Sequence, residues 1–83
     1  MINADDLRID TNAHYGIEYY IYNDAGEIAA SSIDTIAGSD LREEVKSRLF
    51  AYETLEQEGD RIELAGSRGA LGGRRIVTYT KTD

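Results

Sequence analysis

Residues 39–58 read SDLREEVKSRLFAYETLEQE, and this stretch decides the predicted fold. Its apolar residues are four, four, three and three positions apart, which is typical of one face of a helix with about 3.6 residues per turn. They are Leu41, Val45, Leu49, Tyr52 and Leu55. The pattern predicts one long amphipathic helix from Ser39 to Glu58.

Both ends of this stretch carry helix-boundary residues. Ser39 or Asp40 can accept hydrogen bonds from the free N–H groups of the first turn, and Glu43 would complete a capping box with Asp40. Gly59 follows the last periodic residue and suits a left-handed helix stop.

Other stretches have the composition of β-strands and turns. They are Gly16–Tyr22, Glu27–Ile33, Asp60–Ala65 and Arg74–Thr80, with a turn at residues 23–26 and a glycine-rich connection at residues 66–73. Two hairpins and one helix pack most simply with the helix across one face of a four-stranded antiparallel sheet. We therefore expect an α+β fold in the order ββαββ. Residues 4–8 fit a short N-terminal helix or an extended segment equally well.

Alternation in the first strand separates two faces of the expected sheet. Ile17, Tyr19 and Ile21 are expected to face the core. Glu18, Tyr20 and Tyr22 are expected on the opposite face, open to water or to a partner.

The chain of 83 residues is expected to form a single domain, 1–83. It has no cysteine, so neither a disulfide framework nor a thiolate metal site is expected. The N-terminus lacks the basic head and apolar run of a secretory leader, and no stretch approaches the roughly 20 apolar residues that span a membrane. We expect a cytoplasmic location.

The net charge is −7, and it is unevenly distributed. Residues 1–58 hold thirteen acidic and four basic residues, whereas residues 59–83 hold three acidic and five basic residues. An acidic surface repels nucleic acid and anionic membranes and attracts basic protein surfaces. The alternative reading of the excess acid is solubility or adaptation to high salt.

The predicted helix carries two functional hypotheses. Glu53, Glu56 and Glu58 crowd its C-terminal turns, where the helix dipole disfavours acids, so these residues and Glu43 could form an acidic row that faces a basic partner. Phe50 lies roughly opposite the apolar stripe and could anchor a partner or a second copy. The alternative is that small exposed penalties and a lone exposed aromatic residue are tolerated.

The last hairpin supplies a competing hypothesis. Arg68, Arg74 and Arg75, together with Tyr20 and Tyr22, could bind phosphates and stack bases. No Walker lysine follows the glycines, and the arginines could equally balance acids of the same molecule. His14 is the only histidine and no metal-ligand spacing occurs, so we expect neither enzymatic activity nor a metal or cofactor.

The tyrosine-rich hairpin YYIYNDAGEIAASS and the acidic stretch DLREEVKSRLFAYETLEQE give the chain an outline that resembles small acidic phage-encoded inhibitors, the anti-CRISPR and DNA-mimic class. That class shares no diagnostic motif. The resemblance implies a host-cytoplasmic inhibitor whose carboxylates block a basic channel in a nuclease or CRISPR effector, with Glu43, Glu53, Glu56, Glu58 and Phe50 as contacts.

Three functions therefore stay open at the level of sequence. The first is a non-enzymatic inhibitor or adaptor that binds a basic, nucleic-acid-handling protein through an acidic helix. The second is a homodimeric structural or regulatory module joined through Phe50 or the open sheet face. The third is a nucleic-acid-binding module that uses the tyrosine face and the arginine-rich hairpin.

Overall fold

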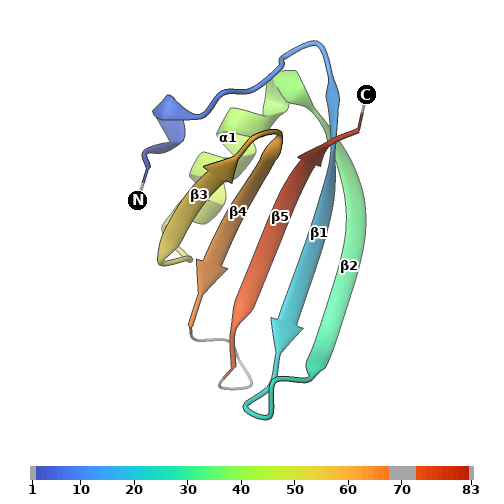
Figure 1. Ribbon diagram of the computed structural model, residues 1–83, viewed down its shortest axis with the longest axis vertical. Coiled ribbons are helices and arrows are strands. Elements are labelled where there is room, and N and C mark those ends of the chain that lie inside the picture. Colours follow the sequence, from blue (N-terminus) through green and yellow to red (C-terminus); the bar gives the residue numbers. More distant parts are fainter. Residues whose placement is uncertain (1, 68–72, 83) are drawn as a thin grey trace.

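The computed structural model describes residues 2–67 and 73–82. It contains one five-stranded sheet in the order β2-β1-β5-β4-β3, in which every neighbouring pair is antiparallel. The elements in chain order are η1 (Ala4–Asp6), β1 (His14–Tyr22), β2 (Ile28–Ala37), α1 (Gly38–Leu49), β3 (Thr54–Glu58), β4 (Arg61–Gly66) and β5 (Arg75–Lys81). Figure 1 shows β2 and β3 at the two edges of this sheet.

The prediction of four strands in the order ββαββ is wrong, although the general α+β class agrees with the structure. The long helix predicted over residues 39–58 ends at Leu49, and residues 54–58 form the additional strand β3. Pairing with β4 brings Leu55 opposite Leu64, and both side chains are fully buried. The strand therefore buries the same leucine that the helical pattern assigned to its apolar stripe.

The helix also begins differently from the prediction. Its N-cap is Ala37, which makes no side-chain capping bond, so neither Ser39 nor Asp40 is the cap. Instead, β2 continues to Ala37 and leads directly into α1, and the Gly38 N–H donates to the Ala13 carbonyl at 2.7 Å. The residue that precedes β1 therefore satisfies one N–H of the first helical turn. Gly59 has a positive φ of 60°, but it lies in the turn between β3 and β4.

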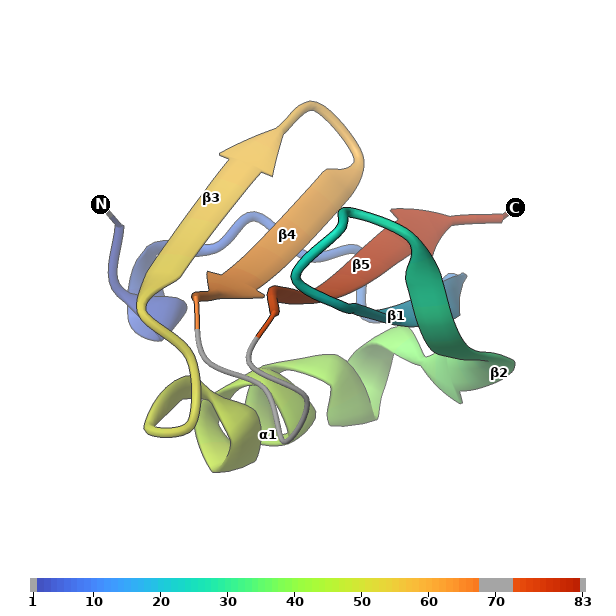
Figure 2. The ribbon, with the colours of Figure 1, turned by 90° about the horizontal axis from the view of Figure 1, so that it is seen from below.

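The core lies between α1 and one face of the sheet (Figure 2). Leu41 and Val45 of α1 are fully buried. The sheet contributes Leu55, Ile62, Leu64, Val77 and Tyr79, also fully buried. Burial of each such aliphatic side chain stabilises the fold by about 1.5–3 kcal/mol, so this cluster fixes which face of every strand points toward the helix.

The phenol of Tyr79 brings a polar group into this core. Its hydroxyl donates to Glu44 Oε2 on α1 at 2.7 Å, and Arg48 pairs with the same carboxylate. Burial, followed by the hydrogen bond to Glu44, raises the pKa of Tyr79 well above its ordinary value. The three side chains therefore join β5 to the helix through satisfied polar groups rather than forming a titrating site.

Candidate functional site on the open face of the sheet

The face of the sheet that α1 leaves uncovered, which we call the open face, carries the alternate residues of each strand. Because Leu55, Leu64 and Val77 point toward the helix, their neighbours Glu56, Glu63 and Thr78 point away from it. The same alternation in β1 places Glu18, Tyr20 and Tyr22 on the open face. The predicted core side is confirmed for Ile17 and Tyr19, which pack against the core, whereas Ile21 is half-buried and is not part of that cluster.

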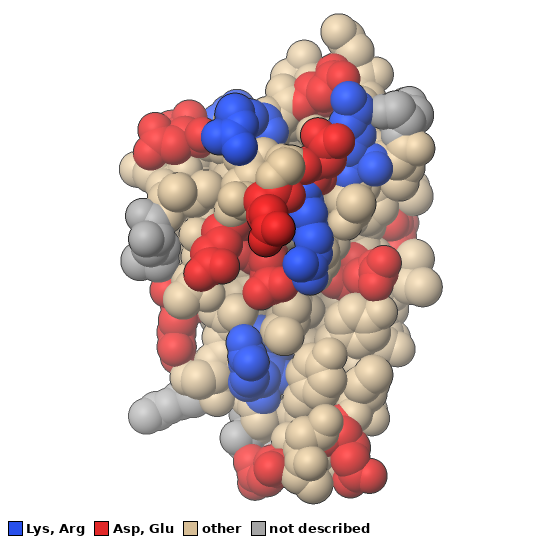
Figure 3. All heavy atoms as spheres, in the orientation of Figure 1, with Lys and Arg blue, Asp and Glu red and all other residues tan. Residues whose placement is uncertain are grey.

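Strand pairing aligns several of these side chains in a single line across the sheet. Glu18 pairs with Thr78, Thr78 with Glu63, and Glu63 with Glu56. We call Glu18, Glu63 and Glu56 the acidic row; Thr78, which lies between Glu18 and Glu63, is only 8% exposed. On the β2 side the line ends at Ile33, which pairs with Glu18. In Figure 3, Asp and Glu atoms lie over the middle of this face, with Lys and Arg atoms among them.

The charge of the acidic row is only partly compensated. Arg61 lies opposite Glu58, and its guanidinium donates to Glu63 Oε2 at 3.0 Å. Glu56 is exposed, and within residues 2–67 and 73–82 neither its carboxylate nor that of Glu58 makes a hydrogen bond or ion pair. Two glutamates on β3 are therefore available for a cation from outside.

Glu18 is linked to the aromatic part of the same face. The Tyr20 hydroxyl donates to Glu18 Oε2 at 2.8 Å, and this hydrogen bond raises the pKa of Tyr20. The Tyr20 and Tyr22 rings lie next to each other on β1, with their centroids 6.3 Å apart. Ile76 on β5 pairs with Tyr20 on β1 and is half-buried. We call Tyr20, Tyr22 and Ile76 the tyrosine patch.

The tyrosine patch borders a hollow in the surface. Tyr22, Gly26, Arg74 and Ile76 line this hollow, which has a volume of about 310 Å³. Gly26, in the turn between β1 and β2, has a positive φ of 79°, a conformation that glycine adopts without strain. The open face thus combines exposed carboxylates, two aromatic rings and one arginine beside a shallow recess.

The prediction that Glu43, Glu53, Glu56 and Glu58 lie on one helix is wrong, because α1 ends at Leu49. Only Glu43 lies on α1, whereas Glu56 and Glu58 lie on β3 and face the other side of the sheet. Glu53 lies in the connection between α1 and β3, where it accepts a hydrogen bond from Ser67 Oγ at 2.6 Å. Phe50, at the end of α1, is 88% exposed. Glu43 and Phe50 therefore do not share a surface with Glu56 and Glu58.

The three arginines of the last hairpin are also not one surface. Arg75 points to the helix side, where its guanidinium lies 4.9 Å from the Tyr52 ring centroid and donates to the Ala51 carbonyl. Arg74 lines the hollow on the open face. Arg68 lies outside the described residues. Arg75 therefore holds the end of α1 against the sheet, and Arg74 alone of the two described arginines lines the recess.

Glu63 and Thr78 are not among the contacts that the sequence predicts, and Glu18 is predicted only as a residue of the open sheet face. Period-two alternation already places Glu18 and Glu63 opposite the core face of their strands. What brings them into one line is the pairing of β1 with β5 and of β5 with β4. Local sequence patterns do not determine strand order. The alignment of these residues across the sheet could therefore not be predicted from the sequence.

Comparison of the chain with protein-family models, with curated proteins and with solved structures found no match. Among the described residues, no group of three or more histidine, aspartate and glutamate side chains could hold a metal ion. No helix in the described part of the chain is long and apolar enough to cross a membrane.

Proposed function

We propose that the protein is a non-enzymatic binding protein whose open face holds a basic segment or surface of another protein. The observation that carries this proposal is the position of the acidic row directly beside the tyrosine patch on one exposed face. Carboxylates steer and orient a cationic partner, and tyrosine side chains supply the contacts in which interface energy concentrates.

The chemistry of the partner follows from the layout of the face. Lysine or arginine side chains can pair with Glu56 and Glu58, which have no partner among the described side chains. An apolar or aromatic side chain can cover Tyr20, Tyr22 and Ile76 at the edge of the hollow. A segment that mixes basic and apolar residues therefore fits both parts of the face.

Nucleic acid fits the same face less well. Tyr20 and Tyr22 could stack bases, but Glu18 accepts a hydrogen bond from Tyr20 and places a carboxylate beside the rings. The net charge of −7 opposes phosphate binding over the whole molecule. Proteins that handle nucleic acid expose the basic surfaces that this face complements, so we place the partner among them. Membership of the anti-CRISPR class stays a prediction from the sequence.

A peptide titration tests the proposal. The probe is a synthetic peptide of alternating arginine and leucine, and the comparison is a peptide of equal length with glutamate in place of arginine. We expect chemical-shift changes for the basic peptide at residues of β1, β3, β4 and β5 that face away from α1. Glu56→Lys should weaken this binding by about fivefold, or ~1 kcal/mol.

Glu43→Lys is the matched control, because it makes the same change in net charge on α1, across the sheet from the open face. It should weaken binding much less than Glu56→Lys does. Equal effects of the two variants, or equal binding of the basic and acidic peptides, would contradict the proposal. A gel shift of duplex DNA or single-stranded RNA by the wild-type protein at low salt would favour the nucleic-acid hypothesis instead.

A further inference from the structure

β2 is an edge strand with an exposed and almost uncharged surface. It has ten residues, IAASSIDTIA, of which residues 28–35 are exposed and only Asp34 is charged. Ile33 is 80% exposed and Ile28 57% exposed. Natural proteins usually protect an edge of this length with charges, proline or a covering segment.

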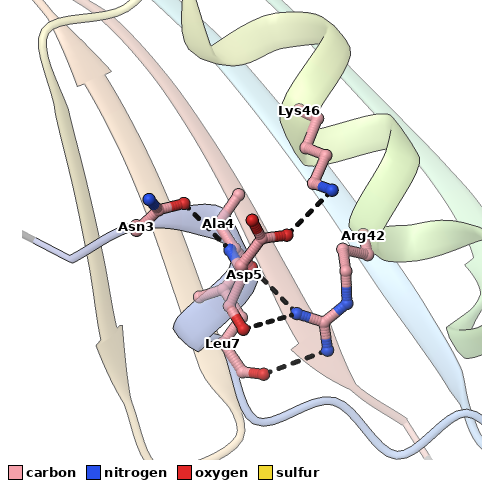
Figure 4. Close-up of polar contacts among 6 residues, drawn as sticks. All are labelled: Asn3, Ala4, Asp5, Leu7, Arg42 and Lys46. Carbon is pink, nitrogen blue, oxygen red and sulfur yellow. Dashed lines mark hydrogen bonds and ion pairs between the residues drawn. The ribbon is translucent and has the colours of Figure 1, made fainter.

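The opposite edge of the sheet is protected in this way. The Ile2 N–H donates to the Leu55 carbonyl on β3, and the Gln57 side chain bonds both the N–H and the C=O of Arg8. Figure 4 shows how Arg42 and Lys46 of α1 hold this N-terminal segment through the carbonyls of residues 4, 5 and 7 and the carboxylate of Asp5. No segment of the described chain covers β2 in a comparable manner.

The register shows which backbone groups of β2 point outward. Gly38 donates to Ala13, so the even-numbered residues from 30 to 36 direct their backbone groups toward β1; the register shifts between Ala30 and Ile28. Ser31, Ile33 and Thr35 therefore direct their N–H and C=O groups away from the sheet. The outward N–H of Thr35 donates to the carboxylate of Asp34 at 2.8 Å, which agrees with this assignment.

We infer that β2 pairs antiparallel with β2 of a second copy of this chain, with Ile33 on the two-fold axis. In this register the exposed Ile33 side chains of the two copies lie side by side, and Ser31 lies opposite the second copy's Thr35. Each Asp34 lies opposite a serine, Ser32 of the second copy, so no like charges face each other. The sequence of β2 is therefore complementary to itself in this register, and a second copy can pair with it without a partner of opposite charge.

The two sheets would form one continuous sheet. Nine paired residues extend about 30 Å along the strand, which is a small interface, so the dimer is expected to be weak and concentration-dependent. Pairing at Thr35 must displace the Asp34 carboxylate from the Thr35 N–H. Asp34 therefore opposes the association, and Asp34→Ala should strengthen it.

Cysteine cross-linking tests the register, because the chain has no cysteine of its own. Directly opposed residues in a hydrogen-bonded antiparallel pair have Cα atoms about 5.5 Å apart, a separation that a disulfide spans. Ile33→Cys should therefore oxidise to a covalent dimer much faster than Phe50→Cys, whose cysteine would be equally exposed at the end of α1. Equal rates for the two variants would overturn the inference.

Sedimentation of the unmodified chain over a range of concentrations provides the second test. We expect a monomer–dimer equilibrium that Ile33→Lys abolishes and Phe50→Lys leaves unchanged. Amide exchange should slow with rising protein concentration at Ser31, Ile33 and Thr35. A monomer up to the solubility limit, or a dimer that Phe50→Lys breaks and Ile33→Lys does not, would overturn the inference. Neither test depends on the proposed peptide binding.

Discussion

Glu56 on β3 lies directly opposite Glu63 on β4, and both side chains point to the open face. Like charges in opposed positions of a sheet are destabilising. Arg61 relieves the repulsion only in part, because its guanidinium pairs with Glu63 and not with Glu56. This pair is an arrangement that folding stability alone does not favour, and it supports a role for the acidic row in binding a cation from outside.

Replacement of Glu56 by lysine should therefore stabilise the fold. The change converts a repulsive cross-strand pair into an attractive one, and we expect a gain of about 0.5 kcal/mol in the free energy of unfolding. Urea denaturation measures this gain, which should shrink at high salt because the charges are exposed. Glu43→Lys, on α1, should give a smaller change. A loss of stability in Glu56→Lys at low salt would contradict the opposition of Glu56 and Glu63.

The sequence predicts the parts of the fold in which periodicity is unambiguous. Leu41 and Val45 have helical spacing, Ile62 and Leu64 alternate, and all four are buried as expected. Leu55 misleads, because it continues the helical spacing from Tyr52 and is buried equally well in β3. Its burial therefore does not distinguish a helix from a strand, and only pairing with β4 does.

The charge pattern of residues 53–58 is a second signal, and it argues against a helix in this segment. Glu53, Glu56 and Glu58 are poorly placed for the C-terminal turns of a helix, and the two interpretations offered for this misplacement, a binding function or a tolerated penalty, both assume that the helix is present. In the structure, Glu56 and Glu58 lie in a strand, where no helix dipole penalises them. An unfavourable charge pattern is thus evidence against the predicted element as much as evidence for a site.

β2 was predicted to end at Ile33, and it continues to Ala37. Both faces of this edge strand are largely exposed, so burial imposes no alternation on its sequence. Strand order determines which residues form the acidic row and also that β2 lies at the edge of the sheet. Local sequence patterns do not encode this order. For this reason the sequence predicts Tyr20 and Tyr22 as contacts but does not predict which residues of the other strands lie beside them.

Arg42 should be important for the N-terminal segment. Its guanidinium donates to the carbonyls of Ala4, Asp5 and Leu7 at 2.9–3.2 Å. Arg42→Lys keeps the charge but loses the forked geometry, and we expect a loss of about 2 kcal/mol in the free energy of unfolding. Amide exchange at residues 2–8 should also accelerate.

Lys46→Met is the matched control for Arg42→Lys. It removes one exposed ion pair, to Asp5, from the same helix and the same segment, and exposed ion pairs contribute little. Its effect on stability should be clearly smaller. Equal effects of the two variants would show that the carbonyl contacts of Arg42 do not hold the segment.

Gly38 should not tolerate a larger side chain. A Cβ atom at this position would lie 2.0 Å from the Asp10 carbonyl oxygen, which belongs to the backbone and cannot rotate away. Gly38→Ala should therefore cost about 1–3 kcal/mol of stability, as overpacking does elsewhere. Gly16→Ala, whose Cβ would come within 3.4 Å of the Thr82 side chain, should cost less in the same thermal unfolding experiment. Similar costs would contradict the close approach at Gly38.

Asp10 should make part of the stability dependent on pH. Two contacts lower the pKa of Asp10. The larger effect comes from the hydrogen bond that the Asn12 N–H donates to its carboxylate, and the smaller from the ion pair with Lys81. Because the folded-state pKa is lower than the unfolded one, this stabilisation is fully present above the ordinary aspartate pKa of about 4. It is lost as the pH falls through the lowered value. Asp10→Asn should therefore be less stable than the wild type at neutral pH, and the difference should close in acid.

Asp24→Asn is the control for this pH dependence. It removes an exposed carboxylate in the turn between β1 and β2, where no hydrogen bond to the Asp24 side chain occurs within the described residues. Urea midpoints measured from neutral pH to about pH 2 should run parallel to those of the wild type for Asp24→Asn and converge with them for Asp10→Asn. If the urea midpoint of Asp10→Asn lies below that of the wild type by the same amount at every pH, the prediction is contradicted. Asp10 then contributes to stability through the conformation of the loop and not through its charge.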